Sequence, residues 1–202
     1  MSQHKRVIVL ASHNPGKIRE FTQLFLDSPF QIEAWPGSGE IVDETGNTYR
    51  DNAYLKAAAV ARMSGKPALA DDSGVEVDAL GGLPGVQSAR FVSEDAWVNS
   101  REILLRLMEV PTLARTARMR AVLCLVTPHA PPCYAEGVVE GTILTWARGS
   151  HGFGVDPIFS VDGRTSLAEY PEEMKNAVSH RARAVRALLA GLEACGAIPG
   201  VQ

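Results

Sequence analysis

The sequence lacks the features that mark several specialised classes of protein. It has only three cysteines, which share no metal-ligand spacing, so we expect free thiols rather than a zinc site or a disulfide framework: Cys124, Cys133 and Cys195. The first apolar run ends by Ala11 and is too short for a signal peptide or a membrane span. The formal net charge of −3 argues against a general nucleic-acid-binding surface. We therefore expect a cytoplasmic protein with neither a membrane nor a nucleic acid as its partner.

The residues that are present fit an ordinary globular chain with a mixed sheet. At 46% hydrophobic and 21% charged, the 202 residues can bury a sizeable core and fit one large domain or two small lobes. Apolar periodicity predicts strands over residues 7–11, 31–35, 67–70, 117–127, 134–146 and 158–161, and helices over 17–26, 48–63, 96–108 and 172–195. The two long strands read as an antiparallel hairpin joined by residues 128–132. This order predicts an α+β arrangement rather than a regular βαβ alternation.

An acidic run at residues 68–76 is the strongest chemical signal. A short apolar strand ends in Asp71 and Asp72, followed by Ser73 and Gly74. Adjacent carboxylates repel, and Mg²⁺ bound through one or two carboxylates plus substrate phosphates would make the pair favourable. A loop at the carboxyl end of a strand is also where α/β sheets place ligands. The alternative is a turn closed by side-chain hydrogen bonds to its own backbone.

Two polar loops precede predicted helices and offer further ligand groups. Residues 12–17 place backbone N–H groups and Lys17 at a helix start, which suits phosphate, although the spacing of a Walker loop is missing. A capped helix with a solvated lysine is the alternative. Asp43 and Glu44 precede the next helix, where acids also simply complement the helix dipole. Lys56 follows one turn after Asn52 on that helix and could equally be a solvated face.

The last third of the chain contains a loop with an aromatic residue and an arginine on the apolar face of a predicted helix. Phe153 lies between Gly152 and Gly154, where a ring beside open backbone suits stacking on a base, although phenylalanine is more often core. Arg181 falls within the apolar stripe of the predicted last helix. A guanidinium aimed at the core needs an anion. That anion is either a ligand or an acidic side chain of the same protein.

Taken together, these segments resemble the inosine-triphosphate pyrophosphatase family, the Ham1-like enzymes. The resemblance covers nearly the whole chain. It rests on Ser12-x-Asn14-x-Gly16-Lys17, Glu44-Thr45-Gly46-x-Thr48, Asp51-Asn52-Ala53 with Lys56, Ala70-Asp71-Asp72-Ser73-Gly74, Asp78 to Gly85 with Ser88-Ala89-Arg90, Gly152-Phe153-Gly154-x-Asp156-Pro157-x-Phe159, and Ser179-His180-Arg181. One departure is Asp43 beside Glu44, where many relatives carry two glutamates, so which of the two reaches a metal stays open.

The resemblance implies hydrolysis of ITP, dITP and XTP at the bond between the α- and β-phosphates, with Mg²⁺ and a homodimer. It implies a single domain, residues 1–202, with an elongated mixed β-sheet flanked by helices and two lobes around a central active-site cleft. Asp72 becomes the acid-base residue, and Asp72, Asp43 and Glu44 become the candidate metal ligands. The candidate substrate-binding residues are Ser12, His13, Asn14, Pro15, Gly16, Lys17, Lys56, Ser73, Phe153, Gly154, Val155, Asp156, Lys175, His180 and Arg181.

Two other functions compete with this interpretation. A Maf-like pyrophosphatase of other modified nucleotides should show an early Ser-x-Ser-Pro-Arg-Arg loop, which this chain lacks. A nucleotide-binding protein without catalysis should have lost the carboxylates, yet Glu44, Asp71 and Asp72 are all present.

Overall fold

The computed structural model describes residues 5–38 and 41–195 and divides the chain into two compact units. Unit 1 comprises residues 1–72, 121–137 and 181–202, and unit 2 comprises residues 73–120 and 138–180. Strands of both units belong to one hydrogen-bonded sheet with the order β2-β1-β3-β4-β5-β6. The two units are described separately below.

Unit 1 is built around parallel strands and three helices. Its elements are β1 (Arg6–Leu10), α1 (Pro15–Leu24), β2 (Phe30–Ala34), α2 (Tyr49–Ser64), the first half of β3 (Ala68–Val77), parts of β4 (Thr116–Thr127) and β5 (Ala130–Ile143), and nearly all of α5 (His180–Ala194). Strand β1 pairs in parallel with both β2 and β3, and Leu10 lies opposite Leu69. Thr48 caps α2 by accepting a hydrogen bond from the backbone of Asp51, as its sequence position predicts.

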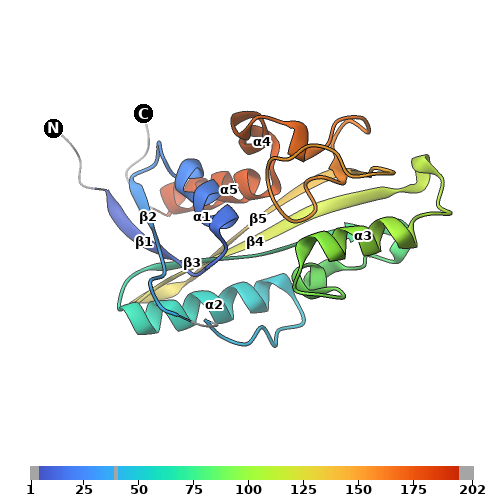
Figure 1. The fold of residues 1–202 in the computed structure, drawn as a ribbon. Helices are drawn as coiled ribbons and strands as arrows, with labels where there is room; N and C mark the ends of the chain where they lie inside the picture. Colours follow the sequence, from blue (N-terminus) through green and yellow to red (C-terminus); the bar gives the residue numbers. More distant parts are fainter. Residues whose placement is uncertain (1–4, 39–40, 196–202) are drawn as a thin grey trace. The chain divides into compact units, whose positions relative to one another are not determined.

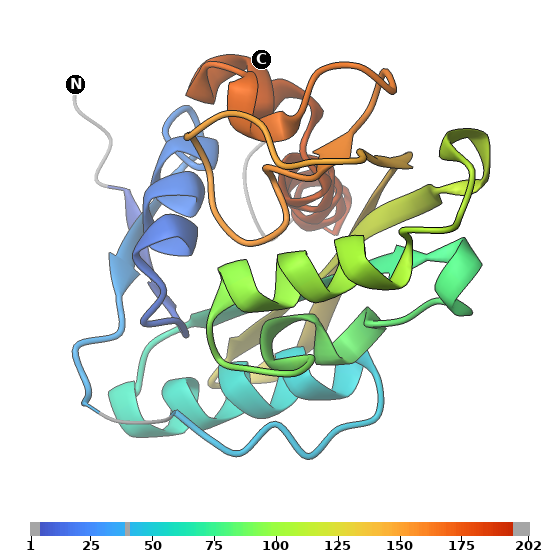
Figure 2. The same cartoon turned by 45° about the vertical axis from the view of Figure 1, so that its right-hand side comes forward.

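Strand β1 and the first half of β3 are buried on both faces, because alternate residues pack against different helices. Ile8, Leu10 and Leu69 share a core with α1 and α5, whereas Val9 and Ala70 share one with α2. Figures 1 and 2 show α1 and α5 on one side of these strands and α2 on the other. Successive side chains of a strand point to opposite faces, so each residue of β3 is assigned to one of two environments.

Unit 2 packs its own core around the remaining strand segments and α3. Its further elements are the short 3₁₀ helices Asp78–Leu80, Gly85–Arg90, Thr112–Ala114 and Leu167–Glu169, the helices α3 (Ala96–Arg106) and α4 (Glu172–Val178), and β6 (Phe159–Ser160). Strand β5 pairs antiparallel with β6, with Ile143 opposite Phe159. Ile103 and Leu107 join these two residues in one buried cluster.

The mixed α/β class and the flanking helices are confirmed, but three local predictions are wrong. Strand β3 does not end at residue 70 but continues through both aspartates to Val77. The predicted helix over residues 172–195 is interrupted at Ser179, whose extended backbone (φ −64°, ψ 152°) separates α4 from α5. The hairpin turn is shorter than predicted, because β5 already begins at Ala130. Within the described residues, no helix combines the length and apolarity needed to cross a membrane.

Candidate active site

Asp71 and Asp72 lie inside β3, so their carboxylates do not share one site. Asp71 has the parity of Leu69 and faces α1 and α5, whereas Asp72 has the parity of Ala70 and faces α2. Each is buried, with 3% and 6% of its surface exposed. The pleat of the strand directs the two carboxylates to opposite faces, so their repulsion is relieved without a shared cation. Each carboxylate instead meets its own set of cations.

The Asp71 carboxylate pairs with one cation from each helix on its face. Its Oδ2 lies 2.8 Å from Lys17 Nζ and 3.1 Å from Arg181 Nε. Arg181 Nη1 also contacts Glu20 Oε2 at 3.2 Å, and Glu20 is itself buried. The anion that Arg181 required in the apolar core is thus found within the protein, as two acidic side chains. The role of Arg181 in holding a ligand stays a prediction.

Burial and charge act in opposite directions on this group. Burial alone would raise the pKa of Asp71, but Lys17 and Arg181 outweigh it and hold the pKa well below its usual range. Burial lowers the pKa of Lys17, and repulsion from Lys56 and Arg181 adds to the effect, while Asp71 opposes it. Asp71 therefore stays ionised and acts as the counter-ion of two buried cations, which is a supporting role.

The Asp72 carboxylate faces a different group, centred on Lys56 of α2. Lys56 Nζ lies 2.9 Å from Asp72 Oδ1, 2.6 Å from Glu44 Oε1 and 3.0 Å from the carbonyl oxygen of Asp71. Asn52, one turn earlier on α2, donates from Nδ2 to Asp72 Oδ2 at 3.4 Å. Lys17 also donates to the Asp71 carbonyl, at 3.2 Å, so one backbone oxygen joins both ammonium groups. The sequence predicted that Asp71 and Asp72 follow the end of a strand, but both residues lie inside β3.

The electrostatics of Asp72 differ from those of its neighbour. Burial raises the pKa of Asp72 and Glu44 adds repulsion, while Lys56 opposes both effects. Burial disfavours the charge of Lys56, but Asp72 and Glu44 outweigh it and raise the pKa of the ammonium group. A carboxylate with a raised pKa beside a permanently charged lysine is suited to accept a proton.

The loop that carries Glu44 is fixed to α2 by a close backbone contact. The amide of Gly46 donates to Asn52 Oδ1 at 2.8 Å. A Cβ on Gly46 would lie 2.6 Å from that same oxygen, so the approach requires glycine. Asp43 is exposed, whereas Glu44 contacts the Lys56 ammonium that also contacts Asp72. Of the two acidic residues in this loop, Glu44 is the one that lies close to Asp72, through their common contact with Lys56.

The start of α1 is a capped helix in this structure. Asn14 Oδ1 accepts from the backbone N–H groups of Gly16 at 2.8 Å and Lys17 at 3.2 Å. The backbone N–H of Asn14 donates a hydrogen bond to Ser12 Oγ at 3.2 Å, while His13 and Pro15 are exposed. The N–H groups predicted to bind phosphate are thus occupied by the cap. The Lys17 side chain is 18% exposed and pairs with Asp71, and phosphate binding by this loop stays a prediction.

The remaining predicted residues belong to unit 2, and three of them (Phe153, Asp156 and Lys175) contact one another. Asp156 Oδ2 accepts from Phe153 N at 2.8 Å and pairs with Lys175 Nζ at 2.7 Å. The Lys175 ammonium also lies 4.7 Å from the centre of the Phe153 ring. Gly152, at φ +74°, would bring a Cβ within 2.2 Å of that same carboxylate oxygen, so this loop is shaped by glycine. Gly154 and Val155 lie in the same loop, Ser73 follows Asp72 on β3, and His180 is buried.

Two buried residues of the site were missed by sequence reasoning. Glu20 lies three residues after Lys17 on α1, and this spacing on a helix with one apolar face could have indicated a shared environment. Asn52 is the second missed residue. It shares a helix face with Lys56 as predicted, but this face is buried rather than solvated. The alanine-rich composition of α2, which leaves little apolar bulk, gave no sign of this burial.

The residues present fit a metal only when substrate supplies further ligands. Among the described residues, no group of three or more histidine, cysteine or acidic side chains could hold a metal ion. Glu44 and Asp72 nevertheless present carboxylate oxygens to one common ammonium group. Such a pair of hard oxygen donors matches Mg²⁺, which commonly binds through one or two carboxylates together with phosphate oxygens and water.

Comparisons with known proteins agree on one family. The Ham1 family profile matches residues 8–191. A dITP/XTP pyrophosphatase of Symbiobacterium thermophilum is 46% identical over 195 residues, which cover 96% of this chain and 98% of that relative. A dITP/XTP pyrophosphatase of Bacillus subtilis is 41% identical over 92% of this chain and 96% of its own length. The solved structure of the Staphylococcus aureus Ham1 protein superposes with a TM-score of 0.79 at 36% identity, covering 94% of this chain and 99% of that one. The resemblance inferred from the motifs is thus confirmed, and the chain belongs to the Ham1 family.

Proposed function

We propose that this chain hydrolyses noncanonical purine nucleoside triphosphates (ITP, dITP and XTP) to the nucleoside monophosphate and pyrophosphate. The names of its relatives support the substrate class, since they are dITP/XTP pyrophosphatases over nearly the whole chain. The observation that carries the proposal is the buried Asp72, whose pKa is raised and whose carboxylate lies 2.9 Å from the Lys56 ammonium. Such a reaction removes deaminated purines before a polymerase can use them. Cytoplasmic location and a homodimer belong to the same proposal.

Glu44 and Asp72 would hold Mg²⁺. When bound, the ion would neutralise charge on the triphosphate and on the departing pyrophosphate. Asp43 is the less suitable ligand, because it is exposed while Glu44 shares a cation with Asp72.

The side chains of unit 1 suit attack of water on the α-phosphorus. Asp72 orients the water and accepts its proton, because burial keeps its pKa above that of an ordinary aspartate and Lys56 stabilises the carboxylate until then. Lys56 and Lys17 bind phosphate oxygens as point charges. Asp71 and Asn52 position these groups, the first through Lys17 and the second through Asp72.

Base selectivity follows from the chemistry of the purine ring. Hypoxanthine and xanthine carry an oxygen acceptor at the position where adenine carries an amino donor. A site that donates a hydrogen bond there rejects adenine, because the donor would be left unpaired. We assign base recognition to Phe153, Asp156 and Lys175, together with His180 and Arg181. Phe153 supplies the stacking surface, and Lys175 holds both the ring and the carboxylate that shapes the loop.

Pyrophosphate release from a panel of nucleotides tests the proposal. ITP, XTP, dITP, GTP and ATP are compared at one concentration, with Mg²⁺ and with EDTA. We expect ITP to be hydrolysed at least about 100-fold faster than ATP, as for a site with a mismatched polar group, and all rates to vanish in EDTA. Equal rates for ITP, GTP and ATP would refute the selectivity. Monophosphate formed with two inorganic phosphates instead of pyrophosphate would refute the site of cleavage.

A further inference from the structure

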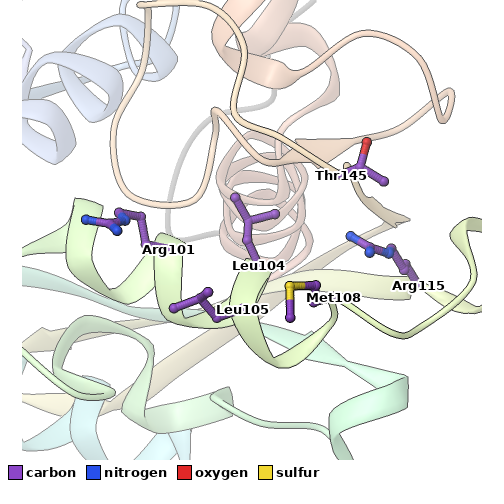
Figure 3. A pocket seen from close by; sticks show the side chains of 6 residues that line it. All are labelled: Arg101, Leu104, Leu105, Met108, Arg115 and Thr145. Carbon is purple, nitrogen blue, oxygen red and sulfur yellow. The ribbon is translucent and has the colours of Figure 1, made fainter.

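Unit 2 contains a hollow of about 420 Å³ that none of the chemistry above uses. Helix α3 contributes Arg101, Leu104 and Leu105, and Met108 follows just after the helix. Arg115 and Thr145 complete the lining, and Figure 3 shows Arg101 and Arg115 at opposite ends with the apolar side chains between them. The volume is in the range of small-molecule sites.

Arg115 is an unusual group to find in such a place. It is only 5% exposed, and its guanidinium donates to three backbone carbonyls, those of Leu107 at 2.7 Å, Val110 at 3.0 Å and Leu144 at 3.3 Å. Within the described part of the chain no carboxylate pairs with it. The Leu107 carbonyl, at the carboxyl end of α3, and the other two carbonyls offset part of the charge through their dipoles. Because a guanidinium has five N–H donors, it retains capacity for a further acceptor.

The rest of the lining makes the hollow both cationic and apolar. None of the described residues that line it is acidic, although the protein has a net charge of −3. Arg101 is exposed and makes no ion pair with any described residue, and the Thr145 hydroxyl has no hydrogen-bond partner among the same residues. Leu105 and Met108 are 57% and 67% exposed, which is unusual for neighbouring large apolar side chains. The lining of the hollow thus combines two guanidinium groups, which pair with no carboxylate of the described residues, with an apolar wall.

We propose that this hollow binds a small organic anion with an apolar body, such as a carboxylate on an aliphatic chain or an aromatic ring. The anionic group would accept hydrogen bonds from Arg115 and Thr145, with Arg101 adding charge at the rim. The body would cover Leu105 and Met108 and remove their surface from water. A buried cation with only carbonyl partners gains more from an anion than an exposed one does, because the local dielectric is low.

The test uses anilinonaphthalene sulfonate, a fluorescent apolar anion, and its uncharged analogue phenylnaphthylamine. We expect the full-length protein to bind the sulfonate at least about tenfold more tightly, since that factor is 1.4 kcal/mol and lies within the range for one ion pair near a surface. Octanoate should displace the sulfonate, and octanol should not. Equal affinity for the charged and the uncharged probe would overturn the proposal without any variant.

A matched pair of variants localises the binding. Met108→Glu places a carboxylate beside Arg115, and Leu113→Glu makes the same change at an apolar residue that is 94% exposed and does not line the hollow. We expect Met108→Glu to weaken sulfonate binding about tenfold or more and Leu113→Glu to leave it within twofold. Equal weakening by both variants would overturn the assignment to this hollow. Far-UV circular dichroism checks that both variants are folded.

Discussion

The neighbouring aspartates of β3 offer a matched comparison, because the same substitution should affect a different property of the protein at each position. Asp71→Asn removes the counter-ion of Lys17 and Arg181 while keeping the shape of the side chain. Asp72→Asn removes a carboxylate whose ionised form is already disfavoured by burial. We expect the first change to act mainly on stability and the second mainly on turnover.

The magnitude for Asp71 follows from its surroundings. Its side chain is 1% exposed and lies 2.8 Å from Lys17 Nζ and 3.1 Å from Arg181 Nε, so the variant removes one charged partner from each of these cations, while Glu20 still contacts Arg181 and the Asp71 carbonyl still accepts from Lys17. Breaking a buried ion pair costs about 3 to 5 kcal/mol, and the retained amide oxygen favours the lower figure. For a chain of this size, about 3 kcal/mol lowers Tm by roughly 6 to 12 °C.

The pH dependence of this stability difference gives an independent test of the role of Asp71. The folded pKa of Asp71 is held below its unfolded value of about 3.9, so its stabilisation is fully present above that pH and is lost as the pH falls toward the folded pKa. The stability difference between the wild type and Asp71→Asn should therefore shrink in acid. A difference that grew as the pH fell would contradict the assigned direction.

For Asp72→Asn we expect a smaller loss of about 1 kcal/mol, because burial already disfavours the charge of Asp72 and Lys56 retains other partners when this ion pair is broken. Lys56 keeps Glu44 at 2.6 Å and the Asp71 carbonyl at 3.0 Å. Turnover of ITP should fall about 100- to 10,000-fold, as for loss of a general base. Urea unfolding and initial rates of pyrophosphate release measure both quantities on both variants. Near-normal turnover in Asp72→Asn, or less than about 1 kcal/mol lost in Asp71→Asn, would refute the division of roles.

Three further predictions concern the surroundings of these groups. Glu44→Gln removes a repulsive charge, so the pKa of Asp72, followed by carboxyl carbon NMR in metal-free protein, should fall; a rise would contradict the coupling. Gly46→Ala places a Cβ 2.6 Å from Asn52 Oδ1 and should displace the loop carrying Glu44, reducing kcat at least about tenfold; unchanged kcat would show that the loop adapts. Arg115→Met removes hydrogen bonds to the carbonyls of Leu107, Val110 and Leu144 and should lower the free energy of unfolding by roughly 2 to 4 kcal/mol in urea titrations.

Much of the fold could be predicted because its signals are local. The apolar run before Asn14 and the periodic segment after it predict β1 and α1, and Thr48 marks the start of α2. The need of Arg181 for an anion was also visible, since it interrupts an apolar stripe. Which anion it meets was not, because Asp71 and Glu20 reach it only through the packing of β3, α1 and α5.

The remaining errors share one cause, namely that tertiary pairing overrides local preference. Two aspartates and a glycine are poor strand formers, yet β3 continues through them because its apolar residues are buried against unit 1 before them and against unit 2 after them. The break at Ser179 involves a single residue in an extended conformation, which leaves helical periodicity on both sides intact. The preference for Glu44 over Asp43 depends on which side chain reaches Lys56, which adjacent letters in a sequence do not reveal.

The parity of β3 has a consequence for how this protein can vary. Leu10 lies opposite Leu69, and two residues beyond it the strand presents one acid to each side of the sheet. Sliding the strand by a single residue would turn each acid to the opposite face of the sheet, so the acid that pairs with Lys17 would face α2 and the acid that pairs with Lys56 would face away from it. The separation of the Lys17 counter-ion from the proposed catalytic carboxylate thus depends on the positions of two identical residues rather than on their identity. Substitutions in β3 can act on one acid at a time, but a one-residue insertion or deletion ahead of Asp71 would take both acids from their partners at once.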